Sequence, residues 1–208
     1  MLYVRPSLSL QCDQAPRAWK GQQMAGAMVT SIVVVGVGGQ GVVTLARWLG
    51  RAAMAAGYDV KIAETHGLSQ RGGSVEVHVR FGEVVRSPTV SEADADYVVA
   101  LEALEALRAF KYLKSDALMV VNKRIINVPG KSVDSAAVFN ALVSLKNVKL
   151  IPAFDIAQRL GGSTYENAVM FGYMAALLGL DRAVDWLDGG NLRAFNEGKK
   201  FISFENIR

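Results

Sequence analysis

The feature that most constrains the fold is a glycine-rich segment that follows a short β-branched run. Residues 32–35 read Ile-Val-Val-Val, and residues 36–41 read Gly-Val-Gly-Gly-Gln-Gly. Four consecutive β-branched residues are typical of a strand that is buried on both faces. Helical apolar spacing follows at about residues 40–56. A strand, a glycine turn and a helix in this order favour a parallel α/β sheet.

The rest of the chain continues this alternation. Apolar patterns predict further strands at residues 58–63, 74–81, 97–101, 117–121 and 148–151. Further helices are predicted at residues 102–113, 135–145, 153–160, 165–178 and 181–187. In residues 74–81, Glu76, His78 and Arg80 alternate with apolar residues, so we expect this strand to be half-exposed. The prediction is a three-layer Rossmann-like α/β domain with a mostly parallel sheet and a helical C-terminal end.

Length and composition limit the number of domains and the class of partner. Residues 28–208 are expected to form one domain, whereas residues 1–27 show no periodicity and are expected to be a flexible extension. A net charge of +4 is too small to predict nucleic-acid binding. No apolar run is as long as a membrane span, so we expect a cytoplasmic protein that does not enter a membrane. Cys12, whose role is open, is the single cysteine, which excludes an internal disulfide, a zinc-thiolate site or an iron–sulfur cluster.

The first glycine loop has two interpretations. Its spacing, Gly-x-Gly-x-x-Gly, is that of dinucleotide-binding folds, and Glu64 ends the next predicted strand where a ribose-binding acid would stand. The alternative is a tight turn in which glycine permits close packing and no ligand binds. Under the first interpretation the loop would bind a cofactor through backbone groups of Gly36, Gly38, Gly39, Gln40 and Gly41.

The second polar loop follows the predicted strand at residues 58–63, so both loops should emerge at the same edge of the sheet. It concentrates hydroxyl, imidazole, amide and guanidinium groups between glycines, and its candidate residues are Thr65, His66, Gly67, Ser69, Gln70, Arg71, Gly72, Gly73 and Ser74. His66 could act as a general acid or base, and Arg71 could bind a carboxylate or phosphate. We favour a contact at a subunit interface over a small-molecule site. His78, on a strand, is interpreted as structural.

Several catalytic motifs are absent from the sequence. The chain has no Walker loop and no nucleophile elbow, and it lacks the Gly-Asp-Gly and paired asparagines of thiamine diphosphate sites. Its two histidines lie on different elements and do not form a metal-binding motif. We therefore expect that the chain does not catalyse a demanding reaction by itself.

The two loops also carry a family resemblance. The glycine loop at residues 36–41, Ala-Ala-Gly-Tyr-Asp-Val-Lys at residues 55–61, Thr-His-Gly-Leu-Ser-Gln-Arg-Gly-Gly-Ser-Val at residues 65–75 and His-Val-Arg-Phe-Gly at residues 78–82 resemble the beta subunit of indolepyruvate ferredoxin oxidoreductase. This subunit corresponds to the gamma subunit or domain of the wider 2-oxoacid:ferredoxin oxidoreductases. The resemblance covers about residues 28–190 and favours the indolepyruvate branch.

The resemblance implies a role within a hetero-oligomer. In such enzymes an arylpyruvate is decarboxylated on thiamine diphosphate, electrons pass through 4Fe–4S clusters to ferredoxin, and coenzyme A takes the acyl group. The alpha subunit carries the thiamine and the clusters, so this chain would bind no cofactor alone. Its two loops would pack on the alpha subunit, and Arg71 and the amides of residues 38–41 could contact coenzyme A phosphates.

Three alternatives remain open at this point. The chain could be the gamma subunit of a pyruvate or other 2-oxoacid:ferredoxin oxidoreductase. It could be a free-standing NAD(P)- or FAD-binding oxidoreductase that uses Gly36, Gly38, Gly41 and Glu64. It could also be a regulatory ligand-binding module without chemistry.

Overall fold

The computed structural model describes residues 29–66, 73–127, 133–182 and 184–205. These residues form one six-stranded mixed sheet in the order β2-β3-β1-β4-β5-β6. The strands are β1 (Thr30–Val37), β2 (Asp59–His66), β3 (Ser74–Gly82), β4 (Ala95–Ala100), β5 (Leu113–Asn122) and β6 (Val148–Ile151). The strands β1, β4, β5 and β6 are parallel, whereas β3 is antiparallel to both of its neighbours, β1 and β2. The predicted extension at residues 1–27 lies outside the described residues.

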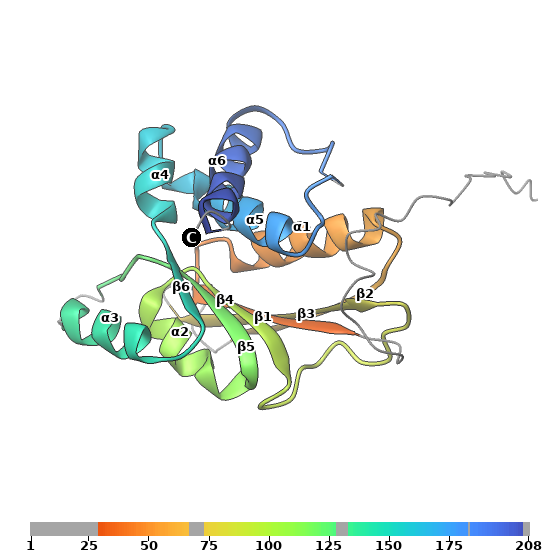
Figure 1. Ribbon diagram of the computed structural model, residues 1–208, viewed down its shortest axis with the longest axis horizontal. Helices are drawn as coiled ribbons and strands as arrows, with labels where there is room; N and C mark the ends of the chain where they lie inside the picture. Colours follow the sequence, from red (N-terminus) through yellow and green to blue (C-terminus); the bar gives the residue numbers. More distant parts are fainter. Residues whose placement is uncertain (1–28, 67–72, 128–132, 183, 206–208) are drawn as a thin grey trace, which may run out of the picture.

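Helices cover both faces of the sheet and make three layers (Figure 1). One face carries α1 (Val42–Ala55), α4 (Ala153–Arg159), α5 (Glu166–Leu177) and α6 (Gly189–Glu205). The other face carries α2 (Ala103–Ala109) and α3 (Ser135–Ser144). Short 3-10 turns, η2 (Phe110–Tyr112) and η3 (Ser163–Tyr165), follow α2 and precede α5. The Rossmann-like α/β prediction is confirmed.

The β-branched run builds both cores at once. In β1, Ile32 and Val34 point into the core beneath α1 and α5, while Val33 and Val35 point into the core against α2 and α3. All four side chains are buried. A central strand that is apolar on both faces therefore fixes the three-layer arrangement.

The expectation of a half-exposed β3 is wrong at His78, whereas Glu76 and Arg80 on the same face are partly exposed. Because β3 lies between β1 and β2, it is an interior strand, and its apolar residues Val77 and Val79 are buried. His78, on the supposedly exposed face, is 4% exposed because the segment after β3 folds back over it and Val90 donates a hydrogen bond to its ring.

The C-terminal prediction is partly wrong. The described residues of the predicted helix at 181–187, which are 181–182 and 184–187, form turns and irregular structure, and a helix, α6, begins at Gly189 instead. Gly198 of α6 and Gly172 of α5 allow these two helices to pack closely. A methyl group at Gly198 would lie 2.0 Å from the Val169 carbonyl oxygen, and one at Gly172 would lie 2.0 Å from that of Phe195. The backbones of α5 and α6 therefore touch. Among the described residues, no helix is long and apolar enough to cross a membrane.

Candidate ligand and partner site at the carboxyl edge of the sheet

The two sequence-predicted loops meet at one edge of the sheet. Val37 at the end of β1 pairs with Ser74 at the start of β3, and His66 at the end of β2 pairs with Val75. The Gly38 N–H donates a hydrogen bond of 2.8 Å to the Gly73 carbonyl. The prediction that both loops emerge at the same edge is confirmed. The antiparallel β3, which the sequence pattern did not place, brings them together.

The glycines of the first loop have different roles. A methyl group at Gly36 would lie 2.9 Å from Oε1 of Gln40, and one at Gly41 would lie 2.0 Å from Nδ2 of Asn167. Packing within the chain therefore requires glycine at both positions. Gly39 is exposed, has a φ of +98°, and would place a methyl group with none of the described residues within 4 Å. The open side of the loop is thus at Gly39.

Gln40 links the carboxyl ends of β1 and β4 through its side chain. Its Oε1 accepts a hydrogen bond of 2.7 Å from the Val37 N–H, and its Nε2 donates one of 3.0 Å to the Leu101 carbonyl. The Val37 donor is therefore used internally. Helix α1 begins just after Gln40, with Gly41 at the N-cap, no side-chain cap and no acidic residue in its first turn. Its first-turn N–H groups are the donors that this loop can offer to an anion.

A buried polar network continues from Gln40 across the edge. The Leu101 carbonyl also accepts a hydrogen bond of 3.3 Å from Nδ2 of Asn122, at the end of β5. The same Nδ2 donates to Oε2 of Glu166 at 2.8 Å, while Oδ1 of Asn122 accepts from the Phe154 N–H at 3.1 Å. Asn122 is fully buried and therefore joins β4, β5, α4 and α5.

Arg124 supplies the counter-charge of this network. Its guanidinium forms an ion pair with Glu166, which is 4% exposed, and lies 4.4 Å above the ring of Phe154. Sequence analysis did not single out Asn122, Arg124, Glu166 or Asn167. The sequence pattern that could have identified them is the presence of polar residues at the end of a buried strand and at the start of a buried helix.

Two further carboxylates lie at α2, and one of them, Glu105, holds the second loop. Glu102 caps α2 by accepting the Glu105 N–H at 2.8 Å and also accepts the Ile126 N–H at 3.1 Å. Glu105 accepts a hydrogen bond of 2.6 Å from the Ser74 hydroxyl and pairs with Arg108. Ser74, a predicted contact residue, is therefore held against α2.

The remaining predicted residues of the second loop are less fully described. Thr65 is exposed at the end of β2, and only the backbone of His66 is described. Gly67, Ser69, Gln70, Arg71 and Gly72 lie outside the described residues, so their roles stay predictions.

The structure does not bring Glu64 next to the glycine loop. In a dinucleotide fold the acid-bearing strand is adjacent to the first strand, but here β3 lies between β2 and β1. Two strand spacings separate them by about 10 Å. Glu64 instead forms an ion pair of 3.2 Å with Arg47 of α1. This arrangement disfavours the dinucleotide interpretation.

His78 has a structural role at a distance from the loops. Its Nδ1 accepts the Val90 N–H at 2.8 Å, so the proton of the neutral ring lies on Nε2, which donates to Glu76 at 2.9 Å. Tyr112 donates a second hydrogen bond of 2.9 Å to Glu76. Burial raises the pKa of Glu76, but these two hydrogen bonds and favourable electrostatics with neighbouring groups together lower it by more, so its pKa lies below the ordinary value.

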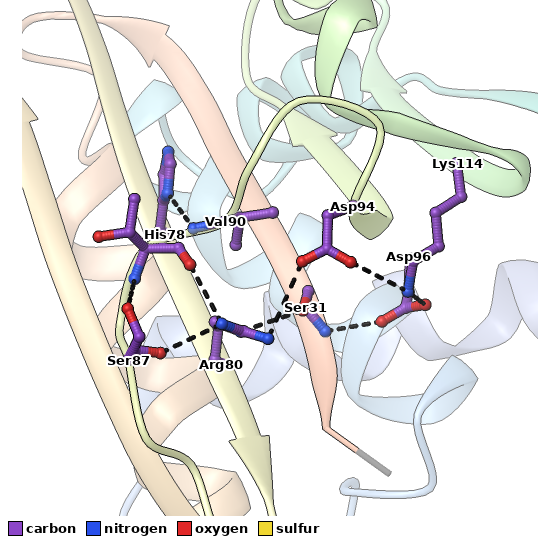
Figure 2. Close-up of polar contacts among 9 residues, drawn as sticks. Ser31, His78, Arg80, Ser87, Val90, Asp94, Asp96 and Lys114 are labelled. Carbon is purple, nitrogen blue, oxygen red and sulfur yellow. Dashed lines mark hydrogen bonds and ion pairs between the residues drawn. The ribbon is translucent and has the colours of Figure 1, made fainter.

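At the opposite end of the strands from the two loops, polar contacts anchor the segment after β3 (Figure 2). Arg80 donates to the Ser31 hydroxyl at 3.2 Å and to the Ser87 carbonyl at 3.4 Å. Asp96 accepts the Ser31 N–H at 2.7 Å and pairs with Lys114 at 2.6 Å. These groups satisfy one another, and they lie where β1 begins, far from the paired loops.

Comparisons with known proteins agree with this fold. Indolepyruvate oxidoreductase subunit IorB of Archaeoglobus fulgidus is 43% identical over 165 residues, which are 74% of this chain and 82% of that protein. The crystal structure of pyruvate oxidoreductase subunit PORC from Thermotoga maritima shares the fold, with a TM-score of 0.62 and 20% identity over 83% of this chain and 96% of that one.

A third comparison concerns a larger protein. The 2-oxoglutarate:ferredoxin oxidoreductase of Magnetococcus marinus, solved with 2-oxoglutarate, coenzyme A and succinyl-CoA bound, has a TM-score of 0.60 and 18% identity. The match covers 83% of this chain and 30% of that one. The model of one protein family matches residues 31–202. This chain therefore belongs to the pyruvate ferredoxin/flavodoxin oxidoreductase family.

Proposed function

We propose that this chain is the beta subunit of an indolepyruvate:ferredoxin oxidoreductase. With an alpha subunit that carries thiamine diphosphate and 4Fe–4S clusters, it completes the oxidative decarboxylation of arylpyruvates to acyl-CoA, with ferredoxin as electron acceptor in the cytoplasm. The observation that carries this proposal is the 43% identity to an indolepyruvate oxidoreductase subunit over most of both chains. The single cysteine supports the division of labour, because a 4Fe–4S cluster needs several thiolates.

The paired loops are the part of the chain that we assign to the complex. Gln40 and the Asn122–Glu166–Arg124 network hold the carboxyl edge of the sheet rigid with buried hydrogen bonds. A rigid edge can present the two loops to the alpha subunit in a fixed orientation. Coenzyme A, when bound, supplies the thiol that accepts the acyl group. This chain contributes hydrogen-bond donors at the start of α1 and the guanidinium of Arg71 toward its phosphates.

Co-expression with the alpha subunit tests this proposal. The purified complex should reduce ferredoxin when indolepyruvate and coenzyme A are both supplied, whereas the lone chain should not. Arg71→Ala should lower turnover at least about tenfold, the effect of losing one charge-assisted contact. Arg86→Ala, which removes an exposed arginine at the opposite edge of the sheet, is the matched control.

Two results would contradict the proposal. Turnover of a keto acid or a reduced nucleotide by the lone chain would exclude a role as a partner subunit. Arg71→Ala with unchanged kinetics and assembly would remove Arg71 from the site. The second candidate, a pyruvate- or 2-oxoglutarate-specific subunit, is favoured by the fold shared with such enzymes. A higher kcat/KM for pyruvate or 2-oxoglutarate than for indolepyruvate would select it.

A further inference from the structure

The segment between β3 and β4, residues 83–94, is held to the sheet at two buried points. This segment, which we call the strap, contains no helix or strand, and most of its residues are exposed. Two of its side chains, Val85 and Val90, are only 3% and 2% exposed. The strap covers His78 of β3, so its release at Val90 would expose an otherwise buried imidazole.

The N–H group of each buried valine is bonded to a side chain that can take up a proton. Val85 donates to Oδ2 of Asp59, and Val90 donates to Nδ1 of His78, each at 2.8 Å. A ring nitrogen that takes up a proton becomes a donor and can no longer accept, and a protonated carboxyl is a weaker acceptor than a carboxylate. Both attachments of the strap therefore weaken in acid.

The His78 ring itself is fixed from its other side. Its Nε2 donates to Glu76 at 2.9 Å, and the edge of the Tyr112 ring packs against it with the two ring centres 5.3 Å apart. Because the Glu76 carboxylate can accept from Nε2 whether the ring is neutral or charged, a second proton does not release the ring. That proton places two donors, Nδ1–H and the Val90 N–H, against each other, so Val90 has to move (Figure 2).

The groups that face His78 from other elements do not replace the lost acceptor. Its register partners on β1 and β2 are Val33 and Ala63, which carry no polar side chain. On η2, Lys111 pairs with Glu92 of the strap at 3.2 Å, and both of these side chains are more than half exposed. Such exposed pairs contribute little to stability, so this one holds the strap only weakly.

Arg80 holds the middle of the strap in a way that does not depend on pH. Its guanidinium donates to the carbonyls of Ser87 at 3.4 Å and Thr89 at 3.1 Å, lies 3.9 Å from Asp94, and stays charged at any pH at which the protein is folded. At the end of the strap, Ala93 has a φ of +57°, a strained conformation for a residue with a Cβ atom. Loss of the Val90 hydrogen bond should therefore free the strap between Thr89 and Ala93.

We propose that the strap is a pH-sensitive element of the fold, which opens at Val90 when His78 takes up a proton at Nδ1. The imidazolium stays paired with Glu76, the Val90 N–H loses its acceptor, and the strap between Thr89 and Ala93 moves away from the face of β3. The His78 ring then becomes accessible to water. No partner subunit takes part in this opening, so it is independent of the proposed function.

The second attachment persists to lower pH. The hydrogen bond from Val85 lowers the pKa of Asp59 below its ordinary value of 3.8. A carboxylate with a lowered pKa keeps its stabilising contact until pH falls through that lower value. An imidazole ordinarily takes up its proton nearer neutral pH than a carboxylate does. The Val90 attachment therefore opens first, while Val85 stays bound.

Hydrogen exchange of the full chain between pH 8 and pH 5, followed by NMR and corrected for intrinsic exchange rates, tests this proposal. Protection of the Val90 amide should fall by up to about tenfold for each unit of pH, because opening takes up one proton. Protection of Val85 and of Val34, in the centre of the sheet, should not change. A parallel fall at Val34 would show that the whole domain opens rather than the strap, and would overturn the proposal.

His78→Asn separates the proton from the contact. The asparagine carbonyl can accept the Val90 N–H but does not titrate, so Val90 protection should become independent of pH. His66→Asn, the same change at the other histidine of the chain, is the matched control and should keep the pH dependence of the unaltered chain. An equal pH dependence in His78→Asn and the unaltered chain would overturn the proposal.

A measurement on the unaltered chain covers the case in which His78→Asn does not fold. The nitrogen resonances of the His78 ring report directly on which ring nitrogen carries a proton. Nδ1 should be unprotonated at neutral pH, and Val90 protection should fall over the same pH range in which Nδ1 gains its proton. Constant Val90 protection while the ring becomes charged would overturn the proposal.

Discussion

The buried ion pair between Arg124 and Glu166 gives the sharpest stability prediction. In Arg124→Met, Glu166, which is 4% exposed in the unaltered chain, keeps its hydrogen bond from Asn122 but loses its counter-charge. Breaking a buried pair by removing one partner costs about 3–5 kcal/mol. Because the Arg124 side chain is 26% exposed, water reaches this pair, so we expect the lower end, about 3 kcal/mol.

The companion substitution separates lost charge pairing from lost packing. Glu166→Gln added to Arg124→Met removes the uncompensated charge, so the double variant should regain about 2 kcal/mol of unfolding free energy. The remaining loss comes from the contact between Arg124 and the Phe154 ring, which is worth about 1 kcal/mol. Arg193→Met, on an exposed position of α6, is the control.

Urea denaturation followed by tryptophan fluorescence measures these differences. Trp48 and Trp186 lie 6.3 Å apart in an aromatic cluster with Phe171, so their emission reports on packing between α1 and α5. Slopes with urea should stay equal among the variants, since the surface exposed on unfolding does not change. If Arg124→Met lost less than about 1 kcal/mol, or the double variant were no more stable than it, the account of the network would be refuted.

Two further predictions concern other parts of the fold. Because the pKa of Glu76 is lowered on folding, its carboxylate stabilises the protein above the ordinary pKa of 4.5, and this contribution is lost as pH falls through the folded value. As pH falls from neutral to 4, the free energy of unfolding should therefore decrease less in Glu76→Gln than in the unaltered chain. Urea midpoints at each pH measure this difference, and equal pH profiles for the two chains would contradict it. Gly172→Ala should push α6 away from α5 and lower unfolding free energy by about 2 kcal/mol or more, because the added methyl meets backbone at 2.0 Å. A melting temperature equal to that of the unaltered chain would show that the two helices do not cross this closely.

Sequence patterns predicted the strands well because each strand carries its own local signal. The run at residues 32–35 is apolar on both faces, and such a run has few positions in an α/β fold other than the centre of the sheet. The position of β3 could not be predicted in this way. Its alternation of Val77 and Val79 with His78 and Arg80 describes a strand with one polar face, but not what covers that face.

Most of the candidate site depends on contacts between distant segments, which no local pattern contains. Gln40 reaches Leu101, and Asn122 reaches Glu166 across 44 positions. Gly41 was assigned to cofactor binding from its spacing, whereas the structure shows that Asn167 also requires a glycine there. In the same way, Gly198 of α6 is explained by the backbone of α5, which a single-helix pattern cannot include.

The antiparallel insertion of β3 has a consequence for how such a subunit can diversify. The register pairs His66 with Val75 and Val37 with Ser74, so both stems that bear the chain connection at residues 67–73 are clamped within the sheet. We therefore expect substitutions or length changes inside that connection to leave strand order, helices and core intact. Related proteins that act on different keto acids could thus differ at a few residues of this connection while keeping the same strands, helices and core.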